Sequence, residues 1–182
     1  MIIGKKIIHY SEIDSTNDEA KRLISKGAGE GTVIIADAQS KGRGKPGFGW
    51  FSPPGVGLYL SAIVKPYKNP KELVLITAIG ASSVVSLISQ LCGLEAKIKL
   101  PNDVILNNKK ICGVLVERVV TGQLIIGIGF NVNNQPGSFP EDIINTATSL
   151  RIATNNEYDL QLVRDKLLNE LDREYLAYLT EI

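Results

Sequence analysis

A glycine-rich loop between two apolar strands constrains this 182-residue chain more than any other feature. The loop lies within residues 42–61, which read GRGKPGFGWFSPPGVGLYLS; the β-branched run 32–36 precedes it and the apolar run 58–64 closes it. Glycine and proline at this density disfavour helix and strand, and glycine lets backbone N–H groups approach a ligand closely. Because Arg43 and Lys45 add positive charge, we predict a strand–loop–strand unit whose loop binds an anion. A mobile surface hairpin is the alternative at this point.

The other segments predict helices and strands that end in an antiparallel meander. Polar capping residues at 14–17 precede an amphipathic run, and the run 70–91 is apolar on almost every side, as in a helix buried against a sheet. We therefore predict an α+β fold in which a mixed, largely antiparallel β-sheet packs with helices in a single domain, residues 1–182. The expected strands are 7–10, 32–36, 58–64, 96–100, 104–106, 109–117 and 123–131, and the expected helices are 19–26, 70–91 and 159–179.

Composition excludes several classes of function. The net charge of +1 gives no general attraction to nucleic acid or to an anionic membrane, and we expect neither as a partner. The single histidine, His9, excludes a multi-histidine metal site, and Cys92 and Cys112 lack the spacing of a metal-binding pair, so we expect buried thiols. The sequence shows no signal peptide and no long apolar run free of polar groups, and we expect a cytoplasmic protein.

Polar residues gather at the predicted strand ends and turns, where one sheet would bring them to one face. Each cluster has a simpler structural interpretation: helix capping for 15–17, a turn cap for Asp103 and a solvated strand position for Lys110. A basic pair, Arg43 and Lys110, with a carboxylate at Asp103 is nevertheless what a reaction at a phosphate requires. The clusters are residues 15–17, residues 39–45, residues 99–103, and Lys110 with Gly113.

Several spaced motifs resemble those of the biotin protein ligases, and together they cover nearly the whole chain. The resemblance implies a class II synthetase-like catalytic domain that joins biotin to ATP, giving biotinyl-5′-adenylate and pyrophosphate, and then transfers biotin to a lysine of a biotin carboxyl carrier protein. It also implies Mg²⁺, bound through the ATP phosphates and not by protein ligands. The motifs are DSTN at 14–17, QSKGRGK at 39–45, WFSP at 50–53, GLYLS at 57–61, KLPND at 99–103, KICGVLVE at 110–117, GIGFN at 127–131 and ATSL at 147–150.

The same resemblance implies roles for individual residues. Lys110, Arg43 and Asp103 are the predicted catalytic residues. Lys110 is expected to stabilise charge while the biotin carboxylate attacks the α-phosphorus, and Arg43 to hold that carboxylate and then the phosphate. Asp103 is expected to orient or deprotonate the lysine amine in the second step. The predicted biotin-binding residues are Ser15, Thr16, Asn17, Gln39, Gly42, Arg43, Gly113 and Leu115, and the predicted ATP- or adenylate-binding residues are Arg43, Gly44, Lys45, Trp50, Lys110 and Asn131.

Some positions depart from the pattern of these ligases. Leu100 stands where the family usually has tryptophan, Lys45 where it has a second arginine, and Pro46 and Phe48 where residues are often basic. Since lysine cannot make the bidentate contact of an arginine, we expect the adenylate to be held less tightly.

The resemblance also sets the expected scope of the chain. Residues 1–182 contain no counterpart of the N-terminal helix-turn-helix domain of repressor-type ligases or of the SH3-like barrel often found at the C-terminus, so we expect no control of transcription. Two alternative functions stay open: a lipoate or octanoate ligase or transferase, against which the GRGK and LPND motifs argue, and a non-catalytic biotin-binding homologue. An exposed sheet edge at Val114–Val120 would allow a homodimer, although a monomer is equally compatible with the sequence.

Overall fold

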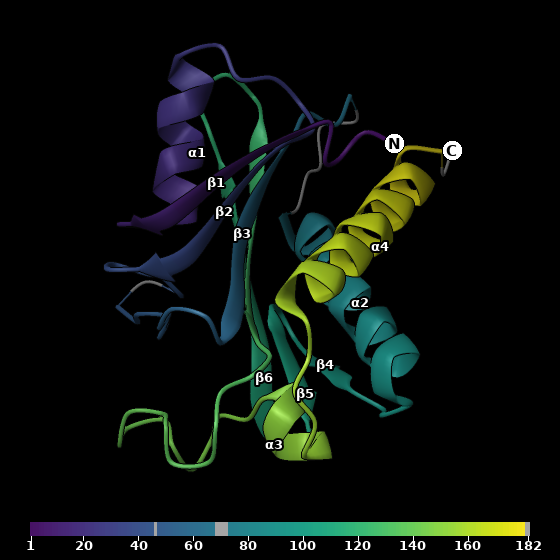
Figure 1. Cartoon of the computed structure of the whole chain (residues 1–182). Coiled ribbons are helices and arrows are strands. Elements are labelled where there is room, and N and C mark those ends of the chain that lie inside the picture. Colours follow the sequence, from purple (N-terminus) through teal and green to yellow (C-terminus); the bar gives the residue numbers. More distant parts are fainter. Residues whose placement is uncertain (46, 68–72, 181–182) are drawn as a thin grey trace.

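The computed structural model describes residues 1–45, 47–67 and 73–180, which form a seven-stranded sheet with helices on both faces (Figure 1). The predicted α+β class is confirmed. The strands are β1 (Lys6–Ile13), β2 (Thr32–Gln39), β3 (Gly57–Val64), β4 (Lys97–Lys99), β5 (Asp103–Leu106), β6 (Lys109–Arg118) and β7 (Leu124–Asn131); the helices are α1 (Thr16–Ser25), α2 (Leu73–Cys92), α3 (Leu150–Thr154) and α4 (Leu160–Thr180).

The strand order is β1-β2-β3-β7-β6-β5-β4, in which β1 and β2 run parallel and every other described pair is antiparallel. Because a parallel pair needs a crossover connection, α1 links β1 to β2 across one face of the sheet. The predicted meander of β5, β6 and β7 is confirmed, and its register places Gly113 opposite both Asp103 and Gly129. Two glycines thus lie side by side at the centre of the sheet.

The predicted sheet edge at Val114–Val120 corresponds to the part of β6 beyond Gly113, where the described sheet pairs β6 on one side only. Residues Cys112–Arg118 pair with β7 on one side, and β5 pairs with β6 on the other side as far as Gly113. The outer strands of the described sheet are β1 and β4. One side of this segment therefore has no partner strand in the described sheet, and a dimer formed through it stays a prediction.

Apolar cores lie on both faces of the sheet. The larger core, with Leu60, Val84 and Leu167, lies between the sheet and the helices α2 and α4, whereas a smaller one, with Ala20 and Ile34, lies under α1. In Figure 1 α1 stands on one side of the sheet and α2 and α4 on the other. This division leaves the N-terminus of α1 at the end of the sheet where β2 leads into the glycine-rich loop.

Helix α2 is the apolar helix that the sequence predicts to be buried. It is described from Leu73, and its predicted start at Pro70 lies outside the described residues. Its length and hydropathy would suit a membrane span, but half of that stretch is buried here, and the helix packs against β6 and α4. Gly80 allows this approach, because a Cβ at that position would lie 2.9 Å from Val114. Cys92, at the end of α2, is only partly buried, unlike Cys112, and both are free thiols.

The glycine-rich loop is more ordered than its composition predicts. Arg43 and Gly49 form an isolated antiparallel bridge, and the N–H of Trp50 donates to the carbonyl of Gly42 at 2.8 Å. The loop therefore folds back on itself before β3 begins, which positions Trp50 toward the sheet. Pro46, one of the predicted departures, lies outside the described residues.

The short helix α3 has no counterpart among the predicted elements. Ser149 caps it by accepting a hydrogen bond from the N–H of Ile152, and Asn155 ends it with φ at 59°. The segment just before α3 runs beside β6: the N–H of Lys110 donates to Thr146 O at 2.7 Å, and the N–H of Thr148 donates to Lys110 O at 2.9 Å. The backbone of Lys110 is therefore held by a segment that is distant in sequence.

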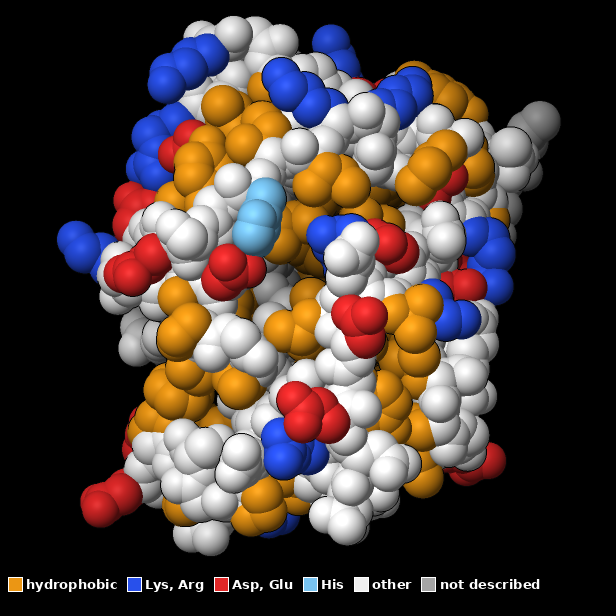
Figure 2. All heavy atoms as spheres, in the orientation of Figure 1, with side chains coloured by type: hydrophobic (Ala, Val, Ile, Leu, Met, Phe, Trp, Pro, Cys, Tyr) orange, Lys and Arg blue, Asp and Glu red, His pale blue; other side chains and the backbone are white. Residues whose placement is uncertain are grey.

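Charged side chains are mixed over the surface. On the face shown in Figure 2, Lys and Arg side chains lie among acidic and hydrophobic ones and form no continuous basic area among the residues described there. The positive charges available to an anionic ligand are therefore those near the glycine-rich loop.

Candidate active site

Two neighbouring cavities lie where the glycine-rich loop meets the sheet. The first is bounded by the N-terminus of α1, the loop, β6 and β7, and the second by the loop, β5, β6 and the segment 139–147. Their volumes are about 40 Å³ and about 310 Å³. The protein's own side chains nearly fill the first cavity, whereas the second has the size of a small-molecule pocket. The residues that line both cavities are Gly44, Lys45, Trp50 and Lys110.

The first cavity collects most of the residues predicted to bind biotin. Gly42 is the exception, because it lies behind the cavity wall: a Cβ there would lie 2.5 Å from Trp50 O. Gly42 therefore shapes the loop, and its ligand contact stays a prediction. The predicted residues that line the first cavity are Ser15, Thr16, Asn17, Gln39, Arg43, Gly113 and Leu115.

Hydrogen bonds between side chains fix the polar wall of this cavity. Gln39 Oε1 accepts from the N–H and the hydroxyl of Thr16, at 2.8 and 3.1 Å. Ser61 Oγ lies 2.8 Å from Thr16 Oγ1 and donates to Asn17 Oδ1 at 2.5 Å, although Ser61 is fully buried. Because each side chain is held by its neighbour, the wall offers a ligand groups with set directions.

Helix capping and ligand binding coexist at the start of α1. Ser15 is the N-cap, and its side chain accepts a hydrogen bond from the N–H of Asp18 at 3.4 Å. Thr16 and Asn17 belong to the first turn and are buried against the cavity. The capping interpretation is therefore confirmed for Ser15, while the other two side chains serve the cavity wall.

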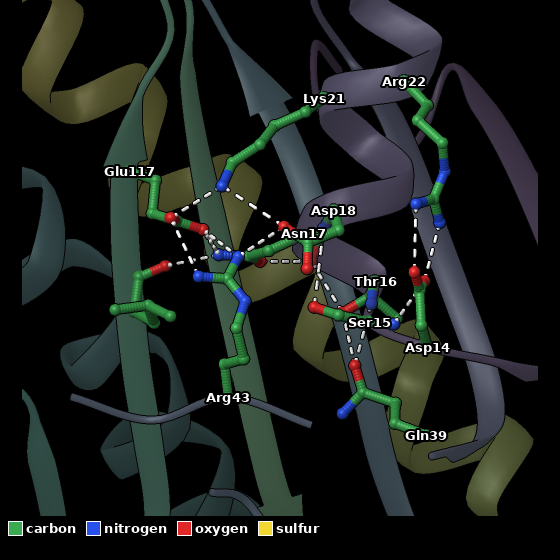
Figure 3. A network of polar contacts seen from close by, with 12 residues as sticks. Asp14, Ser15, Thr16, Asn17, Asp18, Lys21, Arg22, Gln39, Arg43 and Glu117 are labelled. Atoms are coloured by element: carbon green, nitrogen blue, oxygen red, sulfur yellow. Dashed lines mark hydrogen bonds and ion pairs between the residues drawn. The ribbon is translucent and has the colours of Figure 1, made fainter. Parts of the chain in front are cut away.

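A carboxylate outside the set of predicted site residues, Glu117, closes the first cavity from behind. In Figure 3 the guanidinium of Arg43 reaches from the loop to Glu117 on β6, with Asp18 and Lys21 of α1 beside it. Glu117 accepts hydrogen bonds from Arg43 at 2.7 and 3.2 Å, from Lys21 at 2.8 Å and from Asn17 Nδ2 at 2.8 Å. Arg43 was predicted to serve both halves of the site, but it lines the first cavity and not the second.

This environment keeps Glu117 ionised. Burial raises the pKa of Glu117, but hydrogen bonds from Arg43, Lys21 and Asn17 outweigh it and lower the pKa from 4.5 to about 2. The pKa of the Arg43 guanidinium is raised, chiefly because it donates hydrogen bonds to the Glu117 carboxylate. An ionised carboxylate only accepts hydrogen bonds, so the partners of Glu117 must all be donors.

The lowered pKa predicts how stability changes with pH. A carboxylate whose pKa falls on folding stabilises the protein above its unfolded pKa, and this contribution disappears as the pH falls toward the folded pKa. We expect Glu117→Gln to lower the free energy of unfolding by about 1 to 2 kcal/mol at neutral pH, allowing for solvent screening, and this difference to shrink between about pH 5 and about pH 2. Urea unfolding of both proteins across that range measures it. A difference that is constant with pH would contradict the assignment.

Glycines on β7 make room for two side chains of the site. A Cβ at Gly127 would collide with the amide of Asn17, and one at Gly129 would collide with the indole of Trp50. The Trp50 ring therefore lies on the backbone of the sheet, between the two cavities that it lines. Alternate glycines within an apolar strand were the sequence signal of such a close approach.

Gly127 offers a direct test of this packing. We expect Gly127→Ala to displace the Asn17 amide and to weaken binding of the ligand of the first cavity by about 10- to 100-fold, the cost of leaving a buried polar group without its partner. Overpacking should also cost about 1 to 3 kcal/mol of stability. Calorimetric titration with biotin and thermal unfolding measure the two effects. Gly29→Ala is the matched control, because a Cβ at Gly29 meets nothing within 4 Å; equal effects in both variants would refute the prediction.

The second cavity holds a lysine and a carboxylate in direct contact. Lys110 Nζ lies 2.7 Å from Asp103 Oδ1 and 5.3 Å from the centre of the Trp50 ring. Asp103 and Asn131 line this cavity together with Lys45 and Lys110. Predicted phosphate-binding and catalytic residues thus share one cavity, which borders the first at Trp50.

The residues that depart from the family pattern lie on the outside of the site. Phe48 lines the second cavity with its side chain 74% exposed, and Leu100, 73% exposed, lines neither cavity. Lys45 lines both cavities from the exposed loop. These positions do not test the prediction that Lys45 holds the adenylate less tightly than an arginine would, so it stays a prediction.

Two buried polar atoms in the cavity walls have no partner within the described part of the protein: Trp50 Nε1, a donor, and Asn102 Oδ1, an acceptor. Asn102 was not among the predicted site residues, although it lies in the KLPND motif. Its Nδ2 donates to Val114 O at 3.1 Å, which turns Oδ1 away from that strand. A buried polar group without a partner is costly, so both atoms fit a site that is completed by a polar ligand.

The described part of the protein lacks a group of side chains that would bind a metal ion directly. Within residues 1–45, 47–67 and 73–180, no three His, Cys, Asp or Glu side chains are grouped so that they could hold a metal ion. A magnesium ion that enters with a nucleotide keeps phosphate and water oxygens as most of its ligands, and the residues of the second cavity are compatible with that mode.

Comparison with known proteins identifies the family. Residues 10–131 match the Biotin/lipoate A/B protein ligase family. The chain belongs to this family. The bifunctional ligase/repressor BirA of Bacillus subtilis is 34% identical over 98% of this chain. The biotin–[acetyl-CoA-carboxylase] ligase of Mycobacterium tuberculosis is 28% identical over 92% of it. The resemblance inferred from the spaced motifs is therefore confirmed.

A solved member of this ligase family has the same fold. The biotin protein ligase from Aquifex aeolicus, in complex with biotin and ATP, aligns with a TM-score of 0.86 and 34% identity over 97% of this chain and 73% of its own. The chain spans 56% of the length of the Bacillus subtilis protein and 63% of the Mycobacterium tuberculosis protein. The match thus concerns the ligase-family domain itself.

Proposed function

We propose that this domain is an ATP-dependent biotin protein ligase. The observation that carries the proposal is the junction of the two cavities, since Lys110 and Trp50 line both. An acid bound in the first cavity and a nucleotide bound in the second would meet beside the ammonium of Lys110. The Aquifex aeolicus relative binds the same two ligands, biotin and ATP.

In the first step an oxygen of the biotin carboxylate attacks the α-phosphorus of ATP, the bond from that phosphorus to the bridging oxygen breaks, and pyrophosphate leaves. The ammonium of Lys110 stabilises the negative charge that develops around phosphorus. Arg43 offsets the charge of the carboxylate from the first cavity, and Lys45 lies on the loop above. Magnesium, bound with ATP, would add charge neutralisation at the phosphates.

In the second step a lysine amine of the carrier attacks the acyl carbon of biotinyl-5′-adenylate, the bond from that carbon to the phosphate oxygen breaks, and AMP leaves. The lysine ammonium must lose one proton before it attacks, and its nitrogen loses another as the amide forms. Asp103 is a carboxylate of the second cavity that can accept one of these protons. The ordered loop shields the adenylate from water between the two steps.

The second substrate follows from the relatives. The Mycobacterium tuberculosis relative is named for acetyl-CoA carboxylase, so we take the partner to be the biotin carboxyl carrier domain of a biotin-dependent carboxylase. Phe48 and Leu100, which are exposed near the site, give this domain an apolar rim that is available for such a contact.

The test incubates the purified protein with biotin, radiolabelled ATP and Mg²⁺, and adds a carrier domain only in a second tube. Biotin-dependent release of pyrophosphate in the first tube and biotin on the carrier lysine in the second tube are expected. Biotin binding without pyrophosphate would show a non-catalytic binding protein. Activity with lipoate or octanoate but not with biotin would show that the first cavity holds a different acid.

A further inference from the structure

We propose that Glu117 is a positioning residue for biotin recognition, which acts by fixing the amide of Asn17 at the closed end of the first cavity. The inference rests on the proposed function for the identity of the ligand. Glu117 itself does not line either cavity, so it acts through its neighbours.

Hydrogen bonds to three neighbours fix the orientation of the Asn17 amide. Its Nδ2 donates to Glu117 Oε2 at 2.8 Å and to Leu115 O at 3.3 Å, and its Oδ1 accepts from Ser61 at 2.5 Å. A carbonyl and an ionised carboxylate can only accept, so the amide nitrogen must face them. The reversed amide would place its oxygen against two acceptors. Glu117 and Leu115 therefore set which end of Asn17 meets which neighbour.

The orientation of Asn17 matters to a ligand because this side chain forms part of the cavity wall. Asn17 lines the first cavity and is buried, and Gly127 packs against its amide from β7. A ureido group carries two N–H donors and one carbonyl acceptor, so its recognition depends on which protein groups donate and which accept. A reversed or mobile Asn17 would present the wrong group at one of these positions, which costs affinity because a buried polar atom then lacks its partner.

Glu117 differs from Asp18, the other carboxylate of this network, in one contact. Asp18 contacts Arg43 at 2.8 Å and Lys21 at 3.3 Å, the same two cations that Glu117 contacts. Glu117 additionally contacts Asn17. Asp18 and Glu117 can therefore be compared directly. Both neutralise Arg43 and Lys21, but only Glu117 accepts a hydrogen bond from Asn17 (Figure 3).

This pair defines the experiment. Glu117→Gln keeps the size of the side chain but introduces an NH₂ donor beside Asn17, so both amides can reverse together. We expect the KM for biotin to rise by about tenfold or more, the size typical for loss of an outer partner that orients a binding group. The KM for ATP should stay within about twofold. Asp18→Asn, the matched control, should raise the KM for biotin by at most about threefold, because it removes only partly exposed ion pairs, those with Arg43 and Lys21.

Two further measurements keep the test decisive. Calorimetric titration of biotin without ATP should show the same rise in Kd for Glu117→Gln, which a loss of folded protein would not produce. Glu117→Asp, which keeps the charge but withdraws it by one methylene, should also weaken biotin binding, and it replaces the first variant if that one does not fold. Equal effects of Glu117→Gln and Asp18→Asn, or equal rises in the KM values for biotin and ATP, would overturn the proposal. Absence of biotin binding and of pyrophosphate release in the wild type would instead refute the proposed function.

Discussion

Replacing Lys110 by methionine is expected to slow biotin-dependent release of pyrophosphate by about 100- to 1000-fold, the usual cost of removing one group that stabilises transition-state charge. Methionine keeps most of the length and the apolar stem of the side chain, so the substitution removes chiefly the ammonium. Lys110 Nζ lies where the two cavities meet, 2.7 Å from Asp103 and 5.3 Å from the centre of the Trp50 ring. The charge is therefore lost at the place where the carboxylate and the α-phosphate would react.

The neighbouring lysine supplies the control for this prediction. Lys109 is exposed and lines neither cavity, so Lys109→Met should release pyrophosphate at the wild-type rate. Pre-steady-state measurement of pyrophosphate at saturating biotin and ATP separates the chemical step from binding. A variant at Lys110 that loses affinity for ATP but keeps the wild-type rate at saturation would show that this lysine binds the nucleotide without serving the reaction.

Sequence patterns predict most of the fold because the apolar segments are local signals. The β-branched run before the loop and the apolar run after it form β2 and β3 as expected, and the tight turn at Asn107–Asn108 has the positive φ angles of a hairpin. Helix α3 was missed because five residues are too few for a periodic pattern, and a serine cap alone does not distinguish a helix from a turn. The bridge within the glycine-rich loop was missed because composition does not show hydrogen bonds between neighbouring residues.

The candidate site was predictable to the extent that its motifs are recognisable. The residues carried by the motifs reach two adjoining cavities although they come from segments that are far apart in the sequence. Glu117 was missed as a member of the site because it lies 100 residues from Asn17 in the sequence. The role of its carboxylate depends on hydrogen-bond donors that only the folded chain brings near it. The same holds for Asn102, whose unpaired oxygen is visible only once Val114 has taken its NH₂ group. For Glu117, the signal available in the sequence was a carboxylate near the end of an apolar strand.

Replacing Asp103 by asparagine is expected to separate the two half-reactions. Asparagine has nearly the same shape but cannot accept a proton from the carrier lysine, so transfer from preformed adenylate should slow by about 100-fold or more, within the range for loss of a general base. Formation of the adenylate should be affected less, because Lys110 keeps its charge. A single burst of pyrophosphate followed by slow labelling of the carrier is the expected result. Asp165→Asn is the control, since Asp165 is 51% exposed and paired with Arg164 away from both cavities.

The pH dependence of that variant decides between the two roles proposed for Asp103. A free lysine ammonium has a pKa of about 10.4, so solvent deprotonates a growing fraction of the carrier lysine as the pH rises. If Asp103 takes the proton, transfer by Asp103→Asn should increase about tenfold per pH unit between pH 7 and pH 9, and more steeply than in the wild type. If Asp103 only orients the amine, or only holds Lys110 in place, the variant and the wild type should differ by the same factor at every pH. Single-turnover transfer from isolated enzyme-bound adenylate measures this directly, because the first half-reaction is then complete before the carrier is added.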